Sequence, residues 1–292
     1  MSRFLILGAQ GQLGVELQNA FQDAGEVIAL GREGCDLSSG SSIGAAVKAA
    51  RPNVILNAAA YTAVDRAESE PELAMRINGE APGILAEEAK RCGALLVHYS
   101  TDYVFDGAKS APWVEEDPTN PLNVYGETKL AGERNIQQAG GDYLVFRTSW
   151  VFSPRGKNFL LTMLRLGRER TELRIVDDQR GAPTSALALA SATRRIIDAG
   201  RGNSGLYHMT CAGETTWCGF ARAIFARARA EKPWASVIGI PASEYPTPAR
   251  RPGNSVLSNA KLKSTFGVEL PNWESALEVA LRAIGGPGSE GR

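Results

Sequence analysis

The chain has 292 residues, of which 43% are hydrophobic and 22% are charged, an ordinary globular composition. Lysine plus arginine equals aspartate plus glutamate at 32 each, so no net charge would attract nucleic acid or an anionic membrane. The first apolar run, residues 4–7, is too short for a signal peptide or a membrane span. Four cysteines without a CxxC pair and two histidines give no zinc-site spacing. His98, inside an apolar run, is interpreted as a hydrogen-bonded core or inter-element histidine rather than a ligand. We therefore expect a cytoplasmic protein with reduced thiols and no membrane or nucleic-acid partner.

The first half of the chain alternates short apolar runs with amphipathic stretches. Strands are predicted at residues 3–8, 26–30, 53–60, 94–101 and 143–152, with helices at residues 13–25, 41–52 and 72–92 and another around residue 125. This alternation predicts an α/β fold, a Rossmann-type doubly wound parallel sheet over residues 1–152. The rhythm loosens afterwards, and residues 153–285 are expected to form mainly a smaller C-terminal α/β lobe, with some segments returning to the first domain. Residues 286–292 are interpreted as a flexible tail.

Three glycines, Gly8, Gly11 and Gly14, lie between the first predicted strand and the first predicted helix. One glycine permits a sharp turn, another lets the backbone approach a pyrophosphate, and a third lets helix and strand pack closely. The free N–H groups at the start of the helix would bind the phosphates. The spacing is GxxGxxG rather than GxGxxG, and a purely structural turn is the alternative. The position after a buried strand favours a dinucleotide site.

The second predicted strand is followed by "GREGCDL", which places Arg32, and no acidic residue, where the adenosine ribose of a dinucleotide would lie. An acid at that point favours NAD, whereas an arginine accommodates the 2′-phosphate of NADP. We therefore expect NADPH to be the cofactor, with NADH also accepted. A solvated loop cation is the alternative interpretation of Arg32.

Tyr125 and Lys129 stand four residues apart and would project from one face of a helix. A nearby ammonium is expected to lower the pKa of the phenol, which would then exchange protons more easily. Gly126 is unfavourable in a helix and is interpreted as leaving room for a ligand beside the phenol. Thr101 and Asp102 end the fourth predicted strand, at the edge where open α/β sheets bind ligands. A hydroxyl there can stabilise an oxygen that gains charge during hydride transfer.

These motifs resemble the extended short-chain dehydrogenase/reductase family. More narrowly, segments from about residue 3 to residue 280 are similar to the dTDP-4-dehydrorhamnose reductases, namely "NAAAYTAVDRAESEPELA", "HYSTDYVFDG", "PLNVYGETKLAGE", "FRTSWVF", "DDQRGAPT", "GLYHMT" and "YPTPARRPGNSVL". The resemblance implies that the 4-keto group of dTDP-4-dehydro-β-L-rhamnose is reduced by NAD(P)H to give dTDP-L-rhamnose, with the substrate bound mainly by the C-terminal lobe.

The resemblance also implies roles for individual residues. Tyr125 would donate the proton, Lys129 would bind the nicotinamide ribose and tune Tyr125, and Thr101 would hydrogen-bond the reacting oxygen. The cofactor would contact Gly8, Gly11, Gln12, Leu13, Gly14, Arg32, Asp36, Leu37, Ala60, Tyr61, Thr62, Tyr99, Tyr125 and Lys129. The substrate would contact Thr101, Asp102 and Trp150. By their position in "TPARRP", Arg250 and Arg251 are candidates to contact the substrate diphosphate, and solvated loop charges are the alternative.

Some members of the resembled family are thought to dimerise through a metal held by acidic residues. Glu16 fits one such position, but Leu187 occupies the second and cannot bind a metal. We therefore expect a monomer or a metal-independent homodimer and no metal in the site. A dimer bridged by Mg²⁺ is the disfavoured alternative.

Three other functions are compatible with the fold. A sugar-nucleotide dehydratase resembles this chain but carries a glutamate after the strand-end Thr-Asp pair, where this chain has Tyr103. A nucleotide-sugar epimerase is not excluded by any single residue. A non-catalytic NADP-binding regulatory subunit, like that of methionine adenosyltransferase, would retain the Tyr-Lys pair.

Overall fold

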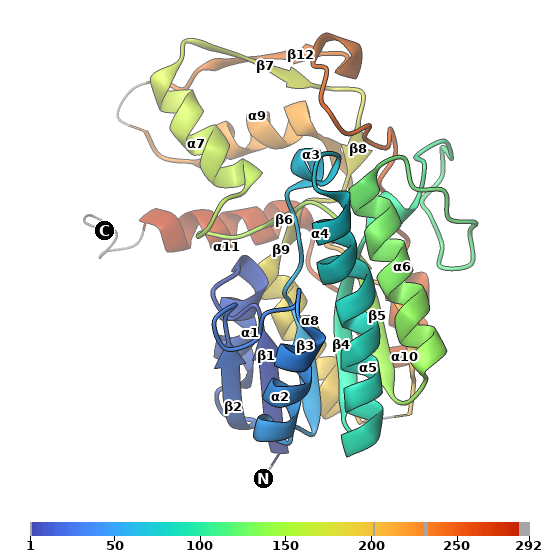
Figure 1. The fold of residues 1–292 in the computed structure, drawn as a ribbon. Helices are drawn as coiled ribbons and strands as arrows, with labels where there is room; N and C mark the ends of the chain where they lie inside the picture. Colours follow the sequence, from blue (N-terminus) through green and yellow to red (C-terminus); the bar gives the residue numbers. More distant parts are fainter. Residues whose placement is uncertain (1, 201, 231–232, 286–292) are drawn as a thin grey trace.

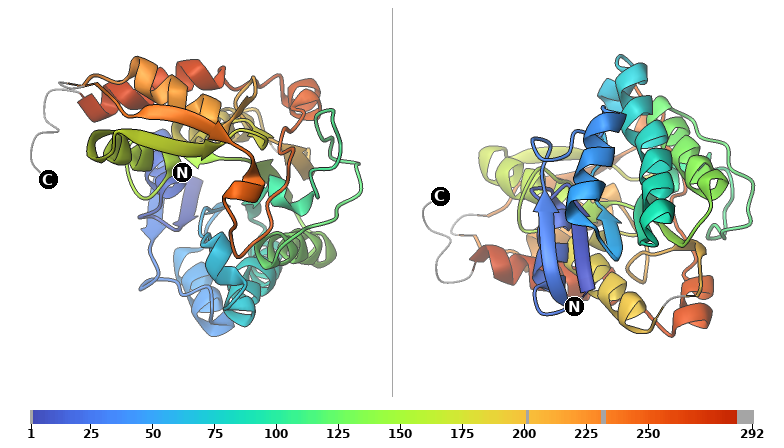
Figure 2. Two further views of the ribbon diagram at one scale, coloured as in Figure 1. Left: turned by 90° about the horizontal axis from the view of Figure 1, so that it is seen from above. Right: turned by 60° about the horizontal axis from the view of Figure 1, so that its bottom comes forward.

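A computed structural model describes residues 2–200, 202–230 and 233–285 (Figure 1). The predicted tail at residues 286–292 lies outside the described residues. A large sheet with helices on both faces forms one part of the molecule, and a smaller group of helices and strands lies beyond one edge of it (Figures 1 and 2).

The main sheet of the described chain has six strands in the order β10-β5-β4-β3-β1-β2, and all of its pairings are parallel. The winding reverses between β1 and β3, and such a switch point opens a crevice at the carboxyl ends of the strands. The strands are β1 (Ser2–Leu7), β2 (Gly25–Leu30), β3 (Val54–Asn57), β4 (Leu95–Thr101), β5 (Tyr143–Thr148) and β10 (Gly205–His208).

Helices cover both faces of this sheet because alternate residues of each strand point to opposite sides. Along β1, Leu5 and Leu7 pack towards one core cluster, while Phe4 and Ile6 pack towards the other. The first face carries α2 (Gly40–Ala50), α5 (Ala81–Cys92) and α6 (Val124–Ala139), and the second carries α1 (Gln12–Phe21) and α8 (Ala186–Asp198). The predicted doubly wound parallel sheet is therefore confirmed.

The smaller lobe is built on two parallel strands, β7 (Glu172–Val176) and β12 (Ser236–Ile240). Helices α7 (Phe159–Glu169) and α9 (Trp217–Arg227) pack beside them (Figure 2). The other elements of the described chain are α3 (Val64–Ala67), η2 (Asp102–Val104), β8 (Arg180–Gly181), β9 (Thr184–Ser185), β11 (Thr215–Thr216), η3 (Ala242–Glu244), α10 (Ala260–Phe266) and α11 (Trp273–Gly285). The chain returns to the main sheet at β10. The proposed division at residue 152 stays a prediction.

Two predicted elements are divided in the structure. The strand predicted at residues 143–152 comprises β5 and β6 (Val151–Phe152), because Trp150 between them has a left-handed backbone with φ 48°. The helix predicted at residues 72–92 comprises α4 (Pro71–Met75), one π-helical turn η1 (Arg76–Glu80) and α5. In both cases the interruption covers only one or a few residues.

The turn between β1 and α1 is held by very close backbone contacts. Gly8 has a positive φ of 77°. A Cβ atom on Gly14 would lie 2.0 Å from the carbonyl oxygen of Gly8. Gly14 therefore serves the packing of α1 against β1, as the third glycine of such a turn is expected to do.

We predict that Gly14→Ala destabilises the protein by about 3 kcal/mol, because the added methyl group meets a backbone oxygen that cannot move independently of the turn. Chemical denaturation monitored by circular dichroism would measure the change. Gly285→Ala is the matched control, since a Cβ atom there meets nothing within 4 Å. A loss of less than about 0.5 kcal/mol for Gly14→Ala would mean that the turn adjusts without strain.

Candidate active site

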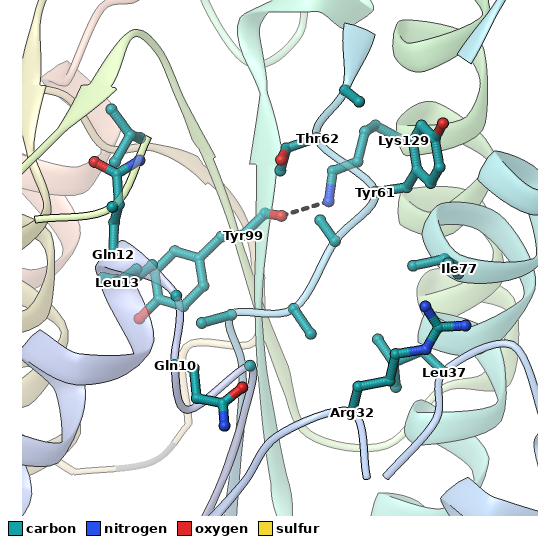
Figure 3. Close-up of a pocket in the computed structure, with 18 of the residues that line it drawn as sticks. Gln10, Gln12, Leu13, Arg32, Leu37, Tyr61, Thr62, Ile77, Tyr99 and Lys129 are labelled. Carbon is teal, nitrogen blue, oxygen red and sulfur yellow. Dashed lines mark hydrogen bonds between the residues drawn. The ribbon is translucent and has the colours of Figure 1, made fainter. Parts of the chain in front are cut away.

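A cavity of about 700 Å³ lies at the carboxyl edge of the sheet, beside the β1–β3 switch point (Figure 3). Most residues predicted to bind the cofactor line it: Gly8, Gly11, Gln12, Leu13, Arg32, Asp36, Leu37, Ala60, Tyr61, Thr62, Tyr99, Tyr125 and Lys129. Gly14, Thr101, Asp102, Trp150 and Arg251 are not part of its lining. The structure thus gathers segments up to about residue 157 around a single space.

The start of α1 forms the end of the cavity suited to phosphate. Its N-cap residue is Gly11, which has no side chain to cap the helix, and its first turn contains no acidic residue. The free N–H groups and the positive end of the helix dipole are therefore available to an anion. Together with the Gly8 turn, this end of the cavity fits a dinucleotide pyrophosphate.

A loop of residues 153–157 passes beside the start of α1. Arg155 Nη1 lies 3.1 Å from Glu16 Oε1, and Asn158 Nδ2 donates to Gln12 Oε1 at 2.8 Å. Lys157, at the end of this loop, lines the cavity. The carboxylate of Glu16 is thus paired with an arginine, and the described residues contain no cluster of three potential metal ligands.

The cavity rim carries Arg32, whose side chain is 76% exposed (Figure 3). Its Nε atom is 3.8 Å from Asp36 Oδ2. Asp36 accepts hydrogen bonds from the backbone N–H and the hydroxyl of Ser38, and these bonds lower its pKa. Arg32 is therefore only loosely held and remains available to a second anion.

Helix α6 brings Tyr125 and Lys129 to the cavity. Asn123 caps its start by accepting from the N–H of Gly126 at 2.8 Å. Lys129 Nζ donates to the carbonyl oxygen of Tyr99 at 2.6 Å (Figure 3). Burial lowers the pKa of Lys129 to about 8.

The predicted lowering of the Tyr125 pKa is wrong. Burial and then the negative charge of Asp102 raise this pKa, and a hydrogen bond with Thr101 opposes them only in part. Lys129 has no such effect because its Nζ atom is directed to the Tyr99 carbonyl and to His98. The phenol is consequently held in its protonated form, which is the form that a proton donor requires.

The interpretation of Gly126 is also wrong. A Cβ atom at this position would lie 2.2 Å from the carbonyl oxygen of Tyr103. The glycine therefore allows the first turn of α6 to pack directly on η2, and it does not make room for a ligand. Its effect on the site is indirect, because the close approach fixes where Tyr125 lies.

Thr101 and Asp102 are buried at the end of β4, next to Tyr125. The Thr101 hydroxyl donates to Asp102 Oδ1 at 3.1 Å, whereas Asp102 Oδ2 has no hydrogen-bond partner among the residues that the structure describes. Burial raises the pKa of Asp102 to about 7. An unpaired carboxyl oxygen in this position can bind a hydroxyl group of a ligand.

The other residues predicted to contact the substrate are engaged elsewhere. Trp150 stacks on Trp217 with ring centroids 3.6 Å apart. Arg251 Nη2 donates to Asp65 Oδ2 at 2.9 Å. The roles of Trp150 and Arg251 in substrate binding stay predictions.

Several lining residues were not predicted from the sequence, among them Gln10, Cys35, Arg66, Ile77, Ser100, Thr148, Val151 and Lys157. Thr148 pairs with Thr101 in the β4–β5 register and ends its strand at the same edge. The strand-end rule that identified Thr101 would have identified Thr148 as well. Lys157 gave no comparable signal, because its place depends on the path of a loop.

A buried ion pair supports the floor of the site. Arg147 donates through Nε and Nη2 to the two carboxylate oxygens of Glu133, at 2.9 and 2.6 Å. Glu133 also accepts from the Ser100 hydroxyl. These contacts join α6 to the ends of β4 and β5.

We predict that Glu133→Gln destabilises the protein by about 4 kcal/mol, because it leaves the buried Arg147 without a counter-charge. The free energy of unfolding measured with urea would test this. Glu169→Gln is the control, since the Arg165–Glu169 pair is exposed and about 0.5 kcal/mol or less is expected there. Equal effects of the two changes would contradict a supporting role for the buried pair.

The fold and the site define a dinucleotide-binding oxidoreductase of the short-chain type, with a glycine turn at one end of the cavity and a tyrosine–lysine pair at the other. The chain matches the family described as RmlD substrate binding domain over residues 2–285, and it belongs to this family.

Its relatives include dTDP-4-dehydrorhamnose reductases from Burkholderia thailandensis, 51% identical over 97% of this chain and 99% of that protein, and from Escherichia coli K12, 45% identical over 96% and 97%. A solved structure of the Bacillus anthracis dTDP-4-dehydrorhamnose reductase, in complex with NADP, has a TM-score of 0.91 at 33% identity and covers 97% of this chain and 100% of that chain. The Thermus thermophilus UDP-glucose 4-epimerase with NAD, at 19% identity over 97% and 99% and a TM-score of 0.81, shows the fold alone.

Proposed function

We propose that this protein reduces the 4-keto group of dTDP-4-dehydro-β-L-rhamnose with NADPH to give dTDP-L-rhamnose. The observation that carries the proposal is a cavity with Tyr125 and Lys129 at one end and an uncapped glycine turn at the other. This cavity lies in a chain that is similar over nearly its whole length to proteins named dTDP-4-dehydrorhamnose reductase. Such likeness favours a reductase over an epimerase, a dehydratase or a regulatory subunit.

The residues present fit a dinucleotide phosphate. The start of α1 offers free N–H groups to the pyrophosphate, and Arg32 lies exposed on the cavity rim. A relative from Bacillus anthracis was solved with NADP. We therefore propose NADPH as the cofactor, with NADH accepted less well. Lys129, which lines the cavity, would bind the nicotinamide ribose.

When bound, the reduced nicotinamide supplies a hydride to C4 of the sugar. The carbonyl π bond breaks as the new C–H bond forms, and negative charge develops on the carbonyl oxygen. The Tyr125 hydroxyl gives its proton to this oxygen and becomes a phenolate. The Thr101 hydroxyl, which in the structure donates to Asp102 Oδ1, would turn its hydrogen to the same oxygen. Because a sugar alkoxide is a stronger base than a phenolate, the raised pKa of Tyr125 does not prevent this transfer.

We further propose that the protein works in the cytoplasm as a monomer or as a homodimer without a bridging metal. Glu16 is paired with Arg155, and Leu187 occupies the second position expected of a metal bridge. No helix in the described ranges is long and apolar enough to cross a membrane. Contact of the substrate diphosphate with Arg251, and of its sugar with Asp102 and Trp150, belongs to the same proposal.

We predict that Tyr125→Phe lowers kcat by about 100-fold or more, because the developing alkoxide loses its proton donor. The assay follows the absorbance of NADPH with dTDP-4-keto-6-deoxyhexose and its epimerase. The unmodified protein should consume one NADPH for each sugar reduced.

Tyr245→Phe is the control, since Tyr245 is 60% exposed and lies outside the cavity lining. A loss of less than about threefold in Tyr125→Phe would exclude this residue as the acid. Sugar conversion without net NADPH consumption would indicate an epimerase or a dehydratase. Binding of NADPH without any turnover would indicate a regulatory subunit.

We predict that Arg32→Ala raises the KM for NADPH by about tenfold and leaves the KM for NADH nearly unchanged, because only NADPH carries the 2′-phosphate. Steady-state kinetics with both cofactors would measure the ratio. Arg165→Ala, which removes an exposed arginine of α7 that does not line the cavity, is the control. An unchanged ratio in Arg32→Ala would assign the selectivity to another residue.

A further inference from the structure

Three polar side chains form a buried row behind the cavity, running from β3 through β4 to α6. Asn57, His98 and Lys129 are each 1% exposed. Asn57 Nδ2 lies 3.0 Å from His98 Nδ1, and His98 Nε2 lies 3.1 Å from Lys129 Nζ. The parallel register sets Asn57 directly opposite His98. His98, expected to be a core or inter-element histidine, is therefore both, and it contacts the lysine of the site.

The positions of the hydrogen atoms on these three side chains depend on one another. Burial lowers the pKa of His98 and the charge of Lys129 acts in the same direction, so the imidazole is neutral and carries a single N–H. The side-chain oxygen of Asn57 accepts the N–H of Ala59 at 3.2 Å, which turns the amide nitrogen towards His98. An amide nitrogen only donates, so this arrangement places the imidazole proton on Nε2, facing Lys129.

An ammonium on Lys129 requires the opposite arrangement. Its N–H must donate to Nε2, so the imidazole proton must lie on Nδ1. The amide of Asn57 must then present its oxygen to His98, and the N–H of Ala59, a residue that lines the cavity, loses this acceptor. The amine form of Lys129, in contrast, accepts from Nε2–H and leaves Asn57 as the structure has it.

We propose that His98 is a positioning residue for Lys129 and that its tautomer changes with the charge of Lys129. In both states Lys129 Nζ bonds to His98 and donates to the carbonyl oxygen of Tyr99, which leaves one N–H for the cavity. The lysine thus keeps one position whether or not it carries a proton. The proposal rests on the proposed function in one respect only, namely that the reaction uses the N–H of Lys129 that faces the cavity.

The surroundings of Lys129 bring its pKa into the pH range in which the protein can be titrated. From β4 it faces His98, and from α6 it has Glu133 one turn later and Tyr125 one turn earlier. Burial lowers the Lys129 pKa to about 8, and Glu133, which is itself bonded to Arg147, acts in the opposite direction. Below that pH the ammonium prevails with an Nδ1–H tautomer, and above it the amine prevails with Nε2–H.

The first test is nitrogen-15 NMR of protein labelled in its histidine rings. The chain has only two histidines, so His208 provides an internal reference. His208 Nδ1 lies 3.1 Å from the carbonyl oxygen of Trp113 and must donate to it, while burial lowers its pKa to about 3. His208 should therefore keep an Nδ1–H tautomer throughout. The His98 signals should change from Nδ1–H to Nε2–H as the pH is raised from about 6 to about 10.

Lys129→Met is the control for this titration, since His98 should then keep one tautomer at every pH. A single unchanging tautomer of His98 in the unmodified protein would overturn the coupling, as would an imidazolium signal. This measurement needs neither substrate nor turnover. Its failure is therefore distinguishable from a failure of the proposed reaction, which the Tyr125→Phe assay tests separately.

The second test compares two replacements of His98. His98→Leu should raise the dissociation constant for NADPH and lower kcat by about tenfold each, because Lys129 loses a fixed hydrogen bond. His98→Gln should stay within about threefold of the unmodified protein, because its amide can either donate to Lys129 or accept from it. His208→Gln changes the other buried histidine, outside the cavity lining, and should leave both values unchanged. Wild-type values for His98→Leu, or equal losses for His98→Gln and His98→Leu in folded protein, would overturn the positioning role.

Discussion

The attachment of α6 to the end of β4 is the constraint on which the site depends. Lys129 Nζ bonds to the carbonyl oxygen of Tyr99, and Gly126 lets the first turn of the helix rest on the carbonyl oxygen of Tyr103. Two contacts about one helical turn apart prevent α6 from rotating about its axis. Tyr125 lies in the same turn and lines the cavity, so these contacts also fix its position. A buried ammonium without such partners would be too costly to retain.

Burial shapes the chemistry of the site more than fixed charge does. It raises the pKa values of Tyr125 and Asp102 and lowers that of Lys129. Each shift favours the neutral form of the group, because the ionised form loses its hydration. The buried charge of Arg147, beside these groups, is neutralised by Glu133. The groups nearest the cavity can therefore exchange protons without leaving an unpaired charge in an apolar environment.

Much of this arrangement was predictable because it follows from local rules. The glycine turn, the strand end at Thr101 and the spacing of Tyr125 and Lys129 are each read within a few residues, and parallel strands bring such segments to one edge. The direction of the Tyr125 pKa was not predictable, since it depends on burial by residues distant in sequence. The left-handed backbone of Trp150 was not predictable either, since no glycine or asparagine marks it. Lys157 likewise reaches the cavity only through the path of its loop.

The contacts that hold Arg251 and Trp150 away from the cavity differ in strength, and this difference bears on how a substrate would be bound. Arg251 pairs with Asp65 across side chains that are 22% and 43% exposed, and partly solvated pairs contribute about 1 kcal/mol or less. Trp150 instead stacks face to face on Trp217 and covers Gly181, so its displacement would expose a large apolar surface. A diphosphate carries more charge than Asp65 and would compete with it for Arg251 at little cost. Arg251 would therefore leave its present partner for a substrate diphosphate more easily than Trp150 would leave Trp217. Trp150 would contact a substrate only from the position that it has in the structure.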